Sequence, residues 1–400
     1  MTHKPILVIV GTRPEGIKMI PLYHELKNAA LSAQLVTTGQ HTDLLRDVFS
    51  SFTVTPDIDL ALGKPNQDLA YLTHAVLTAC TTLYEKVQPS LVAVQGDTTT
   101  VMAAGLAAFY KNIPILHVEA GLRTDDVRQP YPEEMNRRVL GIIADYHCAP
   151  TSLAVANLLA EGINRTKIFY TGNTVVDALR MVRDATTRGH VVVSTELKER
   201  VEHEKALGKK IVLLTAHRRE SFDGGIARIL NAVKKISAHH KNIFFIYPTH
   251  PNPHVQQAVE ESALKSNKNF LVMKPLSYQD LVYLLINSYL VMTDSGGIQE
   301  EAISLGKPTL VLREKTERSE GVWEGIAHLV GTDEEKITTQ FEKILEQPDN
   351  NVERALYGDG YAARKIVTII KNNFPHHETV QNKNSERETT YKRLFKESSL

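Results

Sequence analysis

The chain repeats one pattern, in which a short, uninterrupted apolar run is followed by a polar or glycine-containing turn and then by a helix-forming segment. Ile6 to Val10, Leu91 to Val94 and Ile243 to Tyr247 are three such runs, and none alternates between apolar and polar residues as a half-exposed strand would. Continuous apolar strands are typical of parallel sheets that helices cover on both faces. The sequence therefore predicts an α/β fold with doubly wound, Rossmann-like sheets.

The length of the chain favours two such domains, because 400 residues exceed what a single core of this class usually contains. We place the first domain at residues 1–172 and the second at residues 173–375. Residues 376–400 form a polar tail that lacks a sustained periodic face. The last helix, expected at 361–373, is predicted to pack back on the first domain.

Charge and cysteine content limit the kinds of molecule and metal that the chain is expected to bind. Lys+Arg and Asp+Glu both number 46, so there is no overall field that would attract nucleic acid or a membrane surface. The two cysteines argue against a disulfide framework and against a cysteine zinc site. Because no apolar run approaches membrane-spanning length, we expect a cytoplasmic protein that is not in the membrane and has a small-molecule partner.

Acidic side chains follow two neighbouring strands of the first domain. Asp97 follows the strand predicted at 91–94, and Glu119 follows the one predicted at 113–118. Ligands of α/β proteins bind at this edge of the sheet, so a cleft is favoured over a plain surface position, and in a cleft two carboxylates can serve as acid and base. Glu133 lies in the first turn of the next helix, where helix capping alone is the alternative explanation.

The stretch from Thr293 to Glu301, with the sequence Thr-Asp-Ser-Gly-Gly-Ile-Gln-Glu-Glu, predicts a strand end, a tight turn and a helix start. Glycines at a helix N-terminus let an anion such as a phosphate reach backbone N–H groups, and the helix dipole favours that anion. An ordinary loop with Asp294 or Ser295 as N-cap is the alternative. Gly306 is expected to end the helix in the left-handed conformation.

Basic side chains lie beside other strand ends. Arg13 and Lys18 flank the helix that follows the first strand, where they either stay solvated or hold a phosphate or carboxylate. His217 follows the strand predicted at 210–215 and is either structural or tuned to titrate near neutral pH. The first domain thus offers acids, and the second offers a histidine and an anion-binding turn to a ligand between them.

Signatures of common cofactors are missing from the sequence. No Gly-x-Gly-x-x-Gly follows a strand with an acidic residue about 20 positions on, so a nicotinamide cofactor is not indicated. Neither a phosphate-loop lysine motif nor a cluster of residues at metal-ligand spacing occurs. We therefore expect no cofactor and no metal.

Taken together, the motifs resemble those of the non-hydrolysing UDP-N-acetylglucosamine 2-epimerases over residues 6 to 373. The matching motifs are Gly11-Thr12-Arg13-Pro14-Glu15, Gly96-Asp97-Thr98-Thr99-Thr100, His117-Val118-Glu119-Ala120-Gly121-Leu122-Arg123, Pro132-Glu133-Glu134, His217-Arg218-Arg219-Glu220 and Asp294-Ser295-Gly296-Gly297-Ile298-Gln299-Glu300-Glu301. The resemblance implies a glycosyltransferase-B-like fold, a homodimer and the interconversion of UDP-N-acetylglucosamine and UDP-N-acetylmannosamine. It further implies elimination and re-addition of UDP, for surface polysaccharide synthesis, without a nicotinamide.

The resemblance also assigns roles to residues. The UDP-binding set would be Arg13, Lys18, Ser295, Gly296, Gly297, Glu301 and Arg318. Asp97, Glu119 and Glu133 would share the acid, base and charge-stabilising roles, with His217 close to the diphosphate. Which of the three acids moves the proton at sugar C2 stays open at this point.

Some members of the family bind a second nucleotide-sugar as an activator. The residues of this chain that match such a site are Gln40, His41, Gln67 and His250. Thr42 and Asp43 depart from the family pattern, and an added carboxylate would repel a diphosphate, so we expect weak activation and a hyperbolic rate curve.

Three other functions fit the same motifs. They are an epimerase for a modified UDP-sugar, a glycosyltransferase-B-type UDP-sugar transferase and a UDP-sugar sensor.

Overall fold

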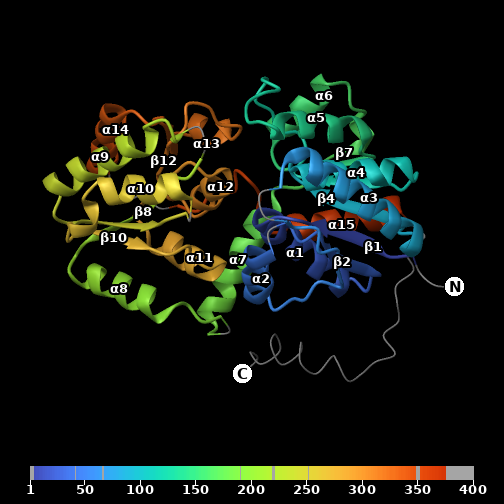
Figure 1. The fold of residues 1–400 in the computed structure, drawn as a ribbon, viewed down its shortest axis with the longest axis horizontal. Helices are drawn as coiled ribbons and strands as arrows, with labels where there is room; N and C mark the ends of the chain where they lie inside the picture. Colours follow the sequence, from blue (N-terminus) through green and yellow to red (C-terminus); the bar gives the residue numbers. More distant parts are fainter. Residues whose placement is uncertain are drawn as a thin grey trace.

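The computed structural model describes residues 4–40, 42–64, 67–189, 191–218, 221–250, 252–347 and 352–374. It contains two parallel β-sheets, each flanked by helices, which form two domains side by side (Figure 1). Helix α7 (Thr174–Thr187) lies between the domains and follows the last strand of the first sheet.

The first domain is built on a seven-stranded sheet in the order β3-β2-β1-β4-β5-β6-β7, and the neighbouring strands pair in parallel. Its strands are β1 (Ile6–Val10), β2 (Ala33–Thr37), β3 (Ile58–Asp59), β4 (Leu91–Gln95), β5 (Ile115–Val118), β6 (Tyr146–Ala149) and β7 (Ile168–Tyr170). Every residue of β1, β4 and β5 is buried, as the uninterrupted apolar runs predict. Its helices are α1 (Arg13–Asn28), α2 (Thr42–Ser51), α3 (Leu69–Val87), α4 (Thr99–Tyr110), α5 (Glu133–Ile143) and α6 (Ser152–Ala160).

The second domain repeats this architecture with a six-stranded parallel sheet in the order β10-β9-β8-β11-β12-β13. Its strands are β8 (Lys210–Thr215), β9 (Ile243–Pro248), β10 (Phe270–Met273), β11 (Leu290–Thr293), β12 (Thr309–Val311) and β13 (Ala327–Leu329). Its helices, besides α7, are α8 (Thr195–Ala206), α9 (Gly225–His239), α10 (Pro253–Glu261), α11 (Tyr278–Asn287), α12 (Gly296–Ser304), α13 (Ser319–Trp323), α14 (Glu334–Glu346) and α15 (Ala362–Asn373).

Strand order explains where a ligand can bind. In each sheet the order reverses at one point, between β1 and β4 in the first domain and between β8 and β11 in the second. Loops at the carboxyl ends of these strands diverge, which is why doubly wound folds bind ligands there. The loops at the two reversal points carry the motifs that contain Arg13, Asp97, His217 and Ser295.

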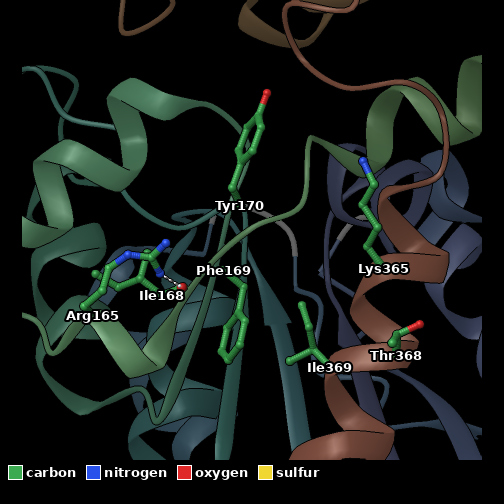
Figure 2. Close-up of a pocket in the computed structure, with 7 residues that line it drawn as sticks. All are labelled: Arg165, Ile168, Phe169, Tyr170, Lys365, Thr368 and Ile369. Carbon is green, nitrogen blue, oxygen red and sulfur yellow. Dashed lines mark hydrogen bonds between the residues drawn. The ribbon is translucent and has the colours of Figure 1, made fainter.

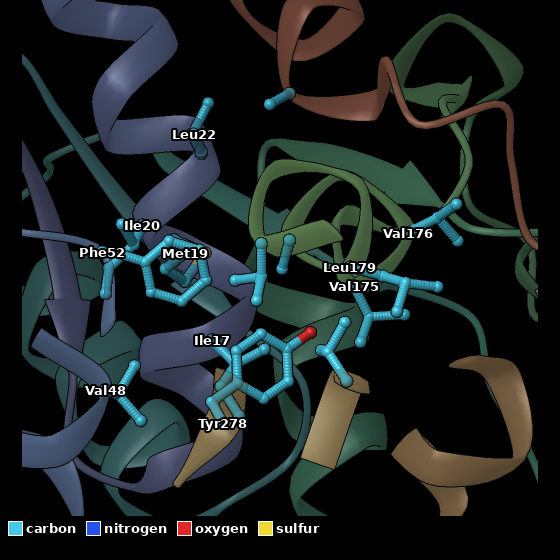
Figure 3. Close-up of a cluster of buried hydrophobic side chains, with 14 of the residues drawn as sticks. Ile17, Met19, Ile20, Leu22, Val48, Phe52, Val175, Val176, Leu179 and Tyr278 are labelled. Carbon is cyan, nitrogen blue, oxygen red and sulfur yellow. The ribbon is translucent and has the colours of Figure 1, made fainter. Parts of the chain in front are cut away.

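The two domains share apolar packing where α1, α7 and α11 meet. Ile17 and Met19 of α1, Val175 and Leu179 of α7, and Tyr278 of α11 belong to one buried cluster (Figure 3). Residues of α15 pack into the same cluster, so this helix covers one side of the apolar contact between the domains.

Helix α15 returns from the second domain to lie against α1 and α7. Its first turn is held by Asp177 of α7, whose carboxylate accepts hydrogen bonds from the backbone N–H groups of Ala362 (3.1 Å) and Ala363 (2.8 Å). Burial raises the pKa of Asp177 to about 6, although these donors favour its ionised form.

The predicted fold class, two doubly wound α/β domains, is confirmed by this arrangement. The strands predicted at 6–10 and 210–215 have the observed bounds, and the strand predicted at 91–94 extends one residue further, to Gln95. The short strands β3 and β13 and the helices α8 and α13 were not predicted. The domain boundary at residue 172 stays a prediction, and the tail at 376–400 lies outside the described residues. In the part of the chain that is described, no helix is long and apolar enough to cross a membrane.

Gly306 follows α12 with a φ of 68°, as predicted for a left-handed helix end. A Cβ atom at this position would lie 2.3 Å from the backbone oxygen of Val352. Gly306→Ala should therefore lower the free energy of unfolding by about 2–4 kcal/mol, through left-handed strain and a clash that backbone cannot relieve.

The matched control is Gly208→Ala, since Gly208 has a φ of 74° and no described atom within 4 Å of an added Cβ. It should cost only about 1 kcal/mol, from strain alone. Urea denaturation of both variants measures the difference, and equal losses would contradict the clash at Val352.

Candidate active site

A buried carboxylate joins two loops at the reversal point of the first sheet. Glu15 accepts hydrogen bonds from the backbone N–H groups of Gly11 (2.6 Å) and Thr12 (3.2 Å) and from the hydroxyl of Thr98 (2.6 Å). The loop after β1 is thereby fixed to the loop after β4 that carries Asp97. This contact between residues far apart in the sequence fixes the loop that carries Asp97, one of the predicted acids.

Glu119 lies in strained backbone directly after β5, with a φ of 63°. It is 6% exposed, and its carboxylate is surrounded by donors. Lys18 Nζ lies 2.5 Å and Asn173 Nδ2 2.7 Å from Oε1, and Gln95 donates to Oε2. Burial opposes ionisation of this carboxyl, but Lys18 and Arg318 outweigh it and hold the pKa of Glu119 below its usual value.

Asp97 and Glu133 have different surroundings. Asp97 Oδ2 forms an ion pair with Arg137 Nη2 at 2.5 Å. Glu133 lies in the first turn of α5, and its buried Oε2 has no hydrogen-bond partner among the described residues. Burial and the nearby charge of Asp97 raise the pKa of Glu133. A hydrogen bond to its own backbone N–H in this first turn favours the ionised form, so helix capping stays the alternative explanation for Glu133.

The glycine turn of the second domain faces Arg318. Gly296 lies so close to this side chain that a Cβ atom would be 2.5 Å from Cζ of the guanidinium, whereas a Cβ on Gly297 would meet no described atom within 4 Å. Ser295 is the N-cap of α12, but its side chain makes no capping hydrogen bond. The hydroxyl of Ser295 and the space at Gly297 are therefore suited to an anionic ligand.

Arg318 also links the two domains. Its Nε donates to Glu300 Oε1 at 2.7 Å, its Nη1 contacts Glu317, and its Nη2 lies 3.8 Å from Glu119 Oε1 of the first domain. Asn173 forms a second link, because its Nδ2 donates to both Glu119 and Glu300. Glu119 of the first domain and the side chains around the glycine turn of the second thus meet at a common interface.

His217 is held by the residue that precedes the glycine turn. Asp294 Oδ2 accepts hydrogen bonds from the backbone N–H groups of His217 (2.6 Å) and Arg218 (2.7 Å), and Asp294 Oδ1 lies 3.4 Å from Nδ1 of the His217 ring. The imidazole stacks on that of His250, with centroids 5.3 Å apart. The positive charge of Arg218 acts on Glu133, which places this loop near the acids.

Arg13 and Glu301 form the other edge of the site. Arg13 Nη2 donates to the carbonyl of Leu276 in the second domain (2.9 Å), and the hydroxyl of Tyr278 donates to Glu301 Oε1 (2.7 Å). Burial raises the pKa of Glu301 to about 7, and it does the same for Glu300 despite Arg318 and Lys18. Both carboxyls lie in α12 after its first turn.

The structure therefore brings Asp97, Glu119, Glu133, Lys18 and Arg318 into one charged cluster, with the glycine turn against Arg318. The residues of the predicted activator site are less clearly grouped. Gln40 accepts a hydrogen bond from Thr100 (2.5 Å), Gln67 accepts one from the backbone of Lys64 (3.2 Å), and His250 stacks on His217. His41 and the side chains of Thr42 and Asp43 lie outside the described residues, so the activator role stays a prediction.

Among the described residues, five side chains that contact the side chains of the cluster do not follow from the sequence analysis. They are Gln95, Arg137, Asn173, Glu300 and Glu317. Glu300 and Glu317 are sequence neighbours of predicted residues, which is a signal that could have found them. Nothing in the spacing along the chain pairs Arg137 with Asp97.

A surface hollow of about 460 Å³ lies elsewhere, between β7 and α15 (Figure 2). It is lined by Arg165, Ile168, Phe169, Tyr170, Lys365, Thr368 and Ile369. None of these residues belongs to the charged cluster, and none carries a carboxylate. This hollow is therefore not the candidate active site.

Comparison with known proteins gives one consistent result. The family model for UDP-N-acetylglucosamine 2-epimerase matches residues 24–371. A UDP-N-acetylglucosamine 2-epimerase of Yersinia pestis is 44% identical over 375 residues, spanning 92% of this chain and 98% of that protein, and one of Escherichia coli K12 is 43% identical over 378 residues with the same shares. The crystal structure of UDP-GlcNAc 2-epimerase from Neisseria meningitidis bound to UDP-GlcNAc has a TM-score of 0.86 at 39% identity, spanning 92% of this chain and 100% of that one.

The raised pKa of Glu301 predicts a pH-dependent stability. A carboxyl whose pKa rises to about 7 on folding stabilises the fold while it is protonated, and this contribution is lost as the pH rises through that value. Relative to Glu301→Gln, which cannot ionise, the unliganded wild-type protein should lose about 2 kcal/mol of unfolding free energy between pH 5 and pH 8. Chemical denaturation across this range measures the difference.

Glu199→Gln on the exposed face of α8 is the control for that titration, because its carboxylate is not desolvated. If Glu301→Gln and Glu199→Gln gave the same pH dependence, the buried carboxyl would not be the cause.

Proposed function

The chain belongs to the UDP-N-acetylglucosamine 2-epimerase family, and from this we propose that its interdomain site interconverts UDP-N-acetylglucosamine and UDP-N-acetylmannosamine by inverting C2 of the sugar. The predicted family and the glycosyltransferase-B-like fold class are confirmed. The observation that carries the proposed activity is the meeting of Asp97, Glu119 and Glu133 with an anion-binding helix start and Arg318 at one interface.

The chemistry requires an indirect route, because C2 bears the acetamido nitrogen and has no carbonyl carbon attached to it, so its hydrogen is barely acidic. Loss of that proton together with cleavage of the C1–O bond to UDP produces a glycal and UDP, through a transition state with oxocarbenium-like charge at C1. Carboxylates stabilise that positive charge, and cations and backbone N–H groups stabilise the departing diphosphate. Re-addition of UDP, with the proton delivered to the opposite face of C2, completes the inversion.

Electrostatics supports a division of labour among the three acids. Glu119 is held ionised by Lys18 and Arg318, which suits a permanent negative charge beside C1. Glu133 has a raised pKa and an unpartnered carboxylate oxygen, which suits the group that carries a proton to or from C2. Asp97, paired with Arg137, suits the partner base on the opposite side.

UDP is proposed to lie on the second domain. The diphosphate would accept hydrogen bonds from the backbone at Gly297 and from Ser295, with Arg318 and Arg13 as cations and His217 facing the leaving oxygen. The open space at Gly297 and the free capping position of Ser295 support this placement. Glu301 would face the ribose, and Lys18 would link the diphosphate end to Glu119.

The proposal also covers where the enzyme works, how it assembles and which pathway uses its product. We place the enzyme in the cytoplasm, where nucleotide-sugars are made, and its product in surface polysaccharide synthesis. The exposed Phe109 and Tyr110 of α4 and Ile142 of α5, on two helices that pack together, support a homodimer.

Incubation with UDP-N-acetylglucosamine in deuterated water tests the activity. NMR should show UDP-N-acetylmannosamine with deuterium at C2, without an added cofactor or metal, because the C2 proton exchanges with solvent during elimination. Product that keeps protium at C2 would rule out this route. Free N-acetylmannosamine as the main product would indicate a hydrolysing enzyme instead.

Substitution of single groups tests the assigned roles. Asp97→Asn, Glu119→Gln, Glu133→Gln and His217→Asn should each lower kcat at least about 100-fold, the scale expected for one well-placed charge or proton carrier. Ser295→Ala and Arg318→Ala should instead weaken UDP binding, measured by calorimetry.

Two controls separate chemistry from folding. Lys315→Met changes an exposed residue in the same loop as Arg318 and should leave both kcat and UDP affinity within about twofold. Thermal unfolding of each variant identifies losses that come from the fold, above all for the buried Glu119. An acid variant that keeps near-native kcat would lose its proposed role.

A further inference from the structure

We propose that Arg137 and Glu317 form a positioning pair that couples the geometry of the catalytic acid Asp97 to the UDP-binding loop of the second domain. The proposal rests on the proposed function, because it concerns the geometry of the same reaction. It assigns a role to two residues that lie beside the substrate-contacting groups rather than among them.

Arg137 holds Asp97 from one side with a fixed guanidinium. It is 4% exposed on α5, and its Nη2 lies 2.5 Å from Asp97 Oδ2 while its Nη1 donates to Glu134 Oε2 at 3.1 Å. The adjacent Asn136 donates to the backbone carbonyl of Asp97 at 2.8 Å. Two consecutive residues of α5 thus fix Asp97, and the same helix carries Glu133 in its first turn.

Glu317 approaches this arrangement from the second domain. It lies in the loop between β12 and α13 and is 5% exposed. Its Oε1 is 3.6 Å from Arg137 Nη2 and contacts Arg318, and its Oε2 is 3.1 Å from Arg313 Nη1. Although burial opposes ionisation, these three guanidinium groups hold the pKa of Glu317 well below its usual range, so it is a fixed negative charge.

The contacts form a chain of opposite charges from the nucleotide end to the sugar end. Arg318, which is proposed to hold the diphosphate, contacts Glu317, Glu317 faces Arg137, and Arg137 holds Asp97. Moving the loop away from the first domain would remove the negative charge of Glu317 from Arg137, whose guanidinium would then be shared by Asp97 and Glu134 alone. The strength with which Arg137 holds Asp97 therefore changes with the position of the loop that carries Arg318.

A positioning role predicts loss of turnover without loss of nucleotide binding. Arg137→Lys keeps the charge but not the planar fork, and Glu317→Gln keeps the shape but not the charge. Each should lower kcat for UDP-N-acetylglucosamine epimerisation about 10- to 100-fold, since small displacements of a reacting group have effects of this size. The UDP dissociation constant should change less than about threefold.

The double variant gives a second measurement. Both residues act on Asp97 through the same series of ion pairs. The double variant Arg137→Lys with Glu317→Gln should therefore lose little more kcat than the worse single variant. Arg138→Met is the matched control: Arg138 also lies on α5 and contacts Glu134 at 3.2 Å, but it does not reach Asp97. It should keep kcat within about twofold.

Several outcomes would overturn the pair. A kcat within twofold of the wild type in either single variant would contradict a positioning role. Equal losses in kcat and in UDP affinity would also contradict it. Fully additive losses of kcat in the double variant would show that the two residues act independently. A crystal structure of the wild-type UDP complex gives a readout that does not depend on turnover, since Glu317 turned away from Arg137 there would also overturn the proposal. Wild-type turnover in the same assay reports separately on the proposed function.

Discussion

The site depends on burying opposite charges from two domains against one another. Removing one partner of a buried ion pair typically costs about 3–5 kcal/mol, because the remaining charge has lost its hydration and gained nothing in return. Glu119 is satisfied by Lys18 of its own domain and by Asn173 and Arg318, which lie beyond the first sheet. The acid is therefore fully partnered only while the domains are in contact, so the interface and the active site form as a unit.

Burial among charges from both domains gives chemically identical glutamate side chains different pKa values. Glu119 and Glu317 are as buried as Glu300 and Glu301, yet the pKa is lowered in the first two and raised in the last two. The difference lies in the balance of nearby charge: Glu317 has three guanidinium groups around it, whereas Glu301 has mainly the hydroxyl of Tyr278. A surplus of carboxyls over cations is tolerated because some of them can stay neutral, which is how one site can contain both a permanent charge and proton carriers.

Sequence reasoning predicted the elements whose signal is local. Strands buried on both faces appear as uninterrupted apolar runs, so the central strands of both sheets were found. The sequence does not predict helix α8, because only Leu197 and Val201 form its apolar side. A glutamate such as Glu204 is expected at the surface, and its burial is explained by the contact with Lys209 Nζ at 2.7 Å, which the sequence does not show. The edge strands β3 and β13 are too short to stand out from a loop, and their neighbours in the sheet define them.

The glycine turn shows why the site itself was only partly predictable. In the sequence Gly296 and Gly297 are equivalent, and both were assigned to phosphate binding. In the structure they differ, because the guanidinium of Arg318 occupies the space where a side chain on Gly296 would lie, while the space beside Gly297 is open. Gly296 is thus required by a contact within the protein, whereas no described atom restricts a side chain at Gly297. Local motifs identify which backbone is exposed to an anion, but the distribution of charge around it is set by residues such as Arg137 and Glu317, which only the packing of two domains brings together.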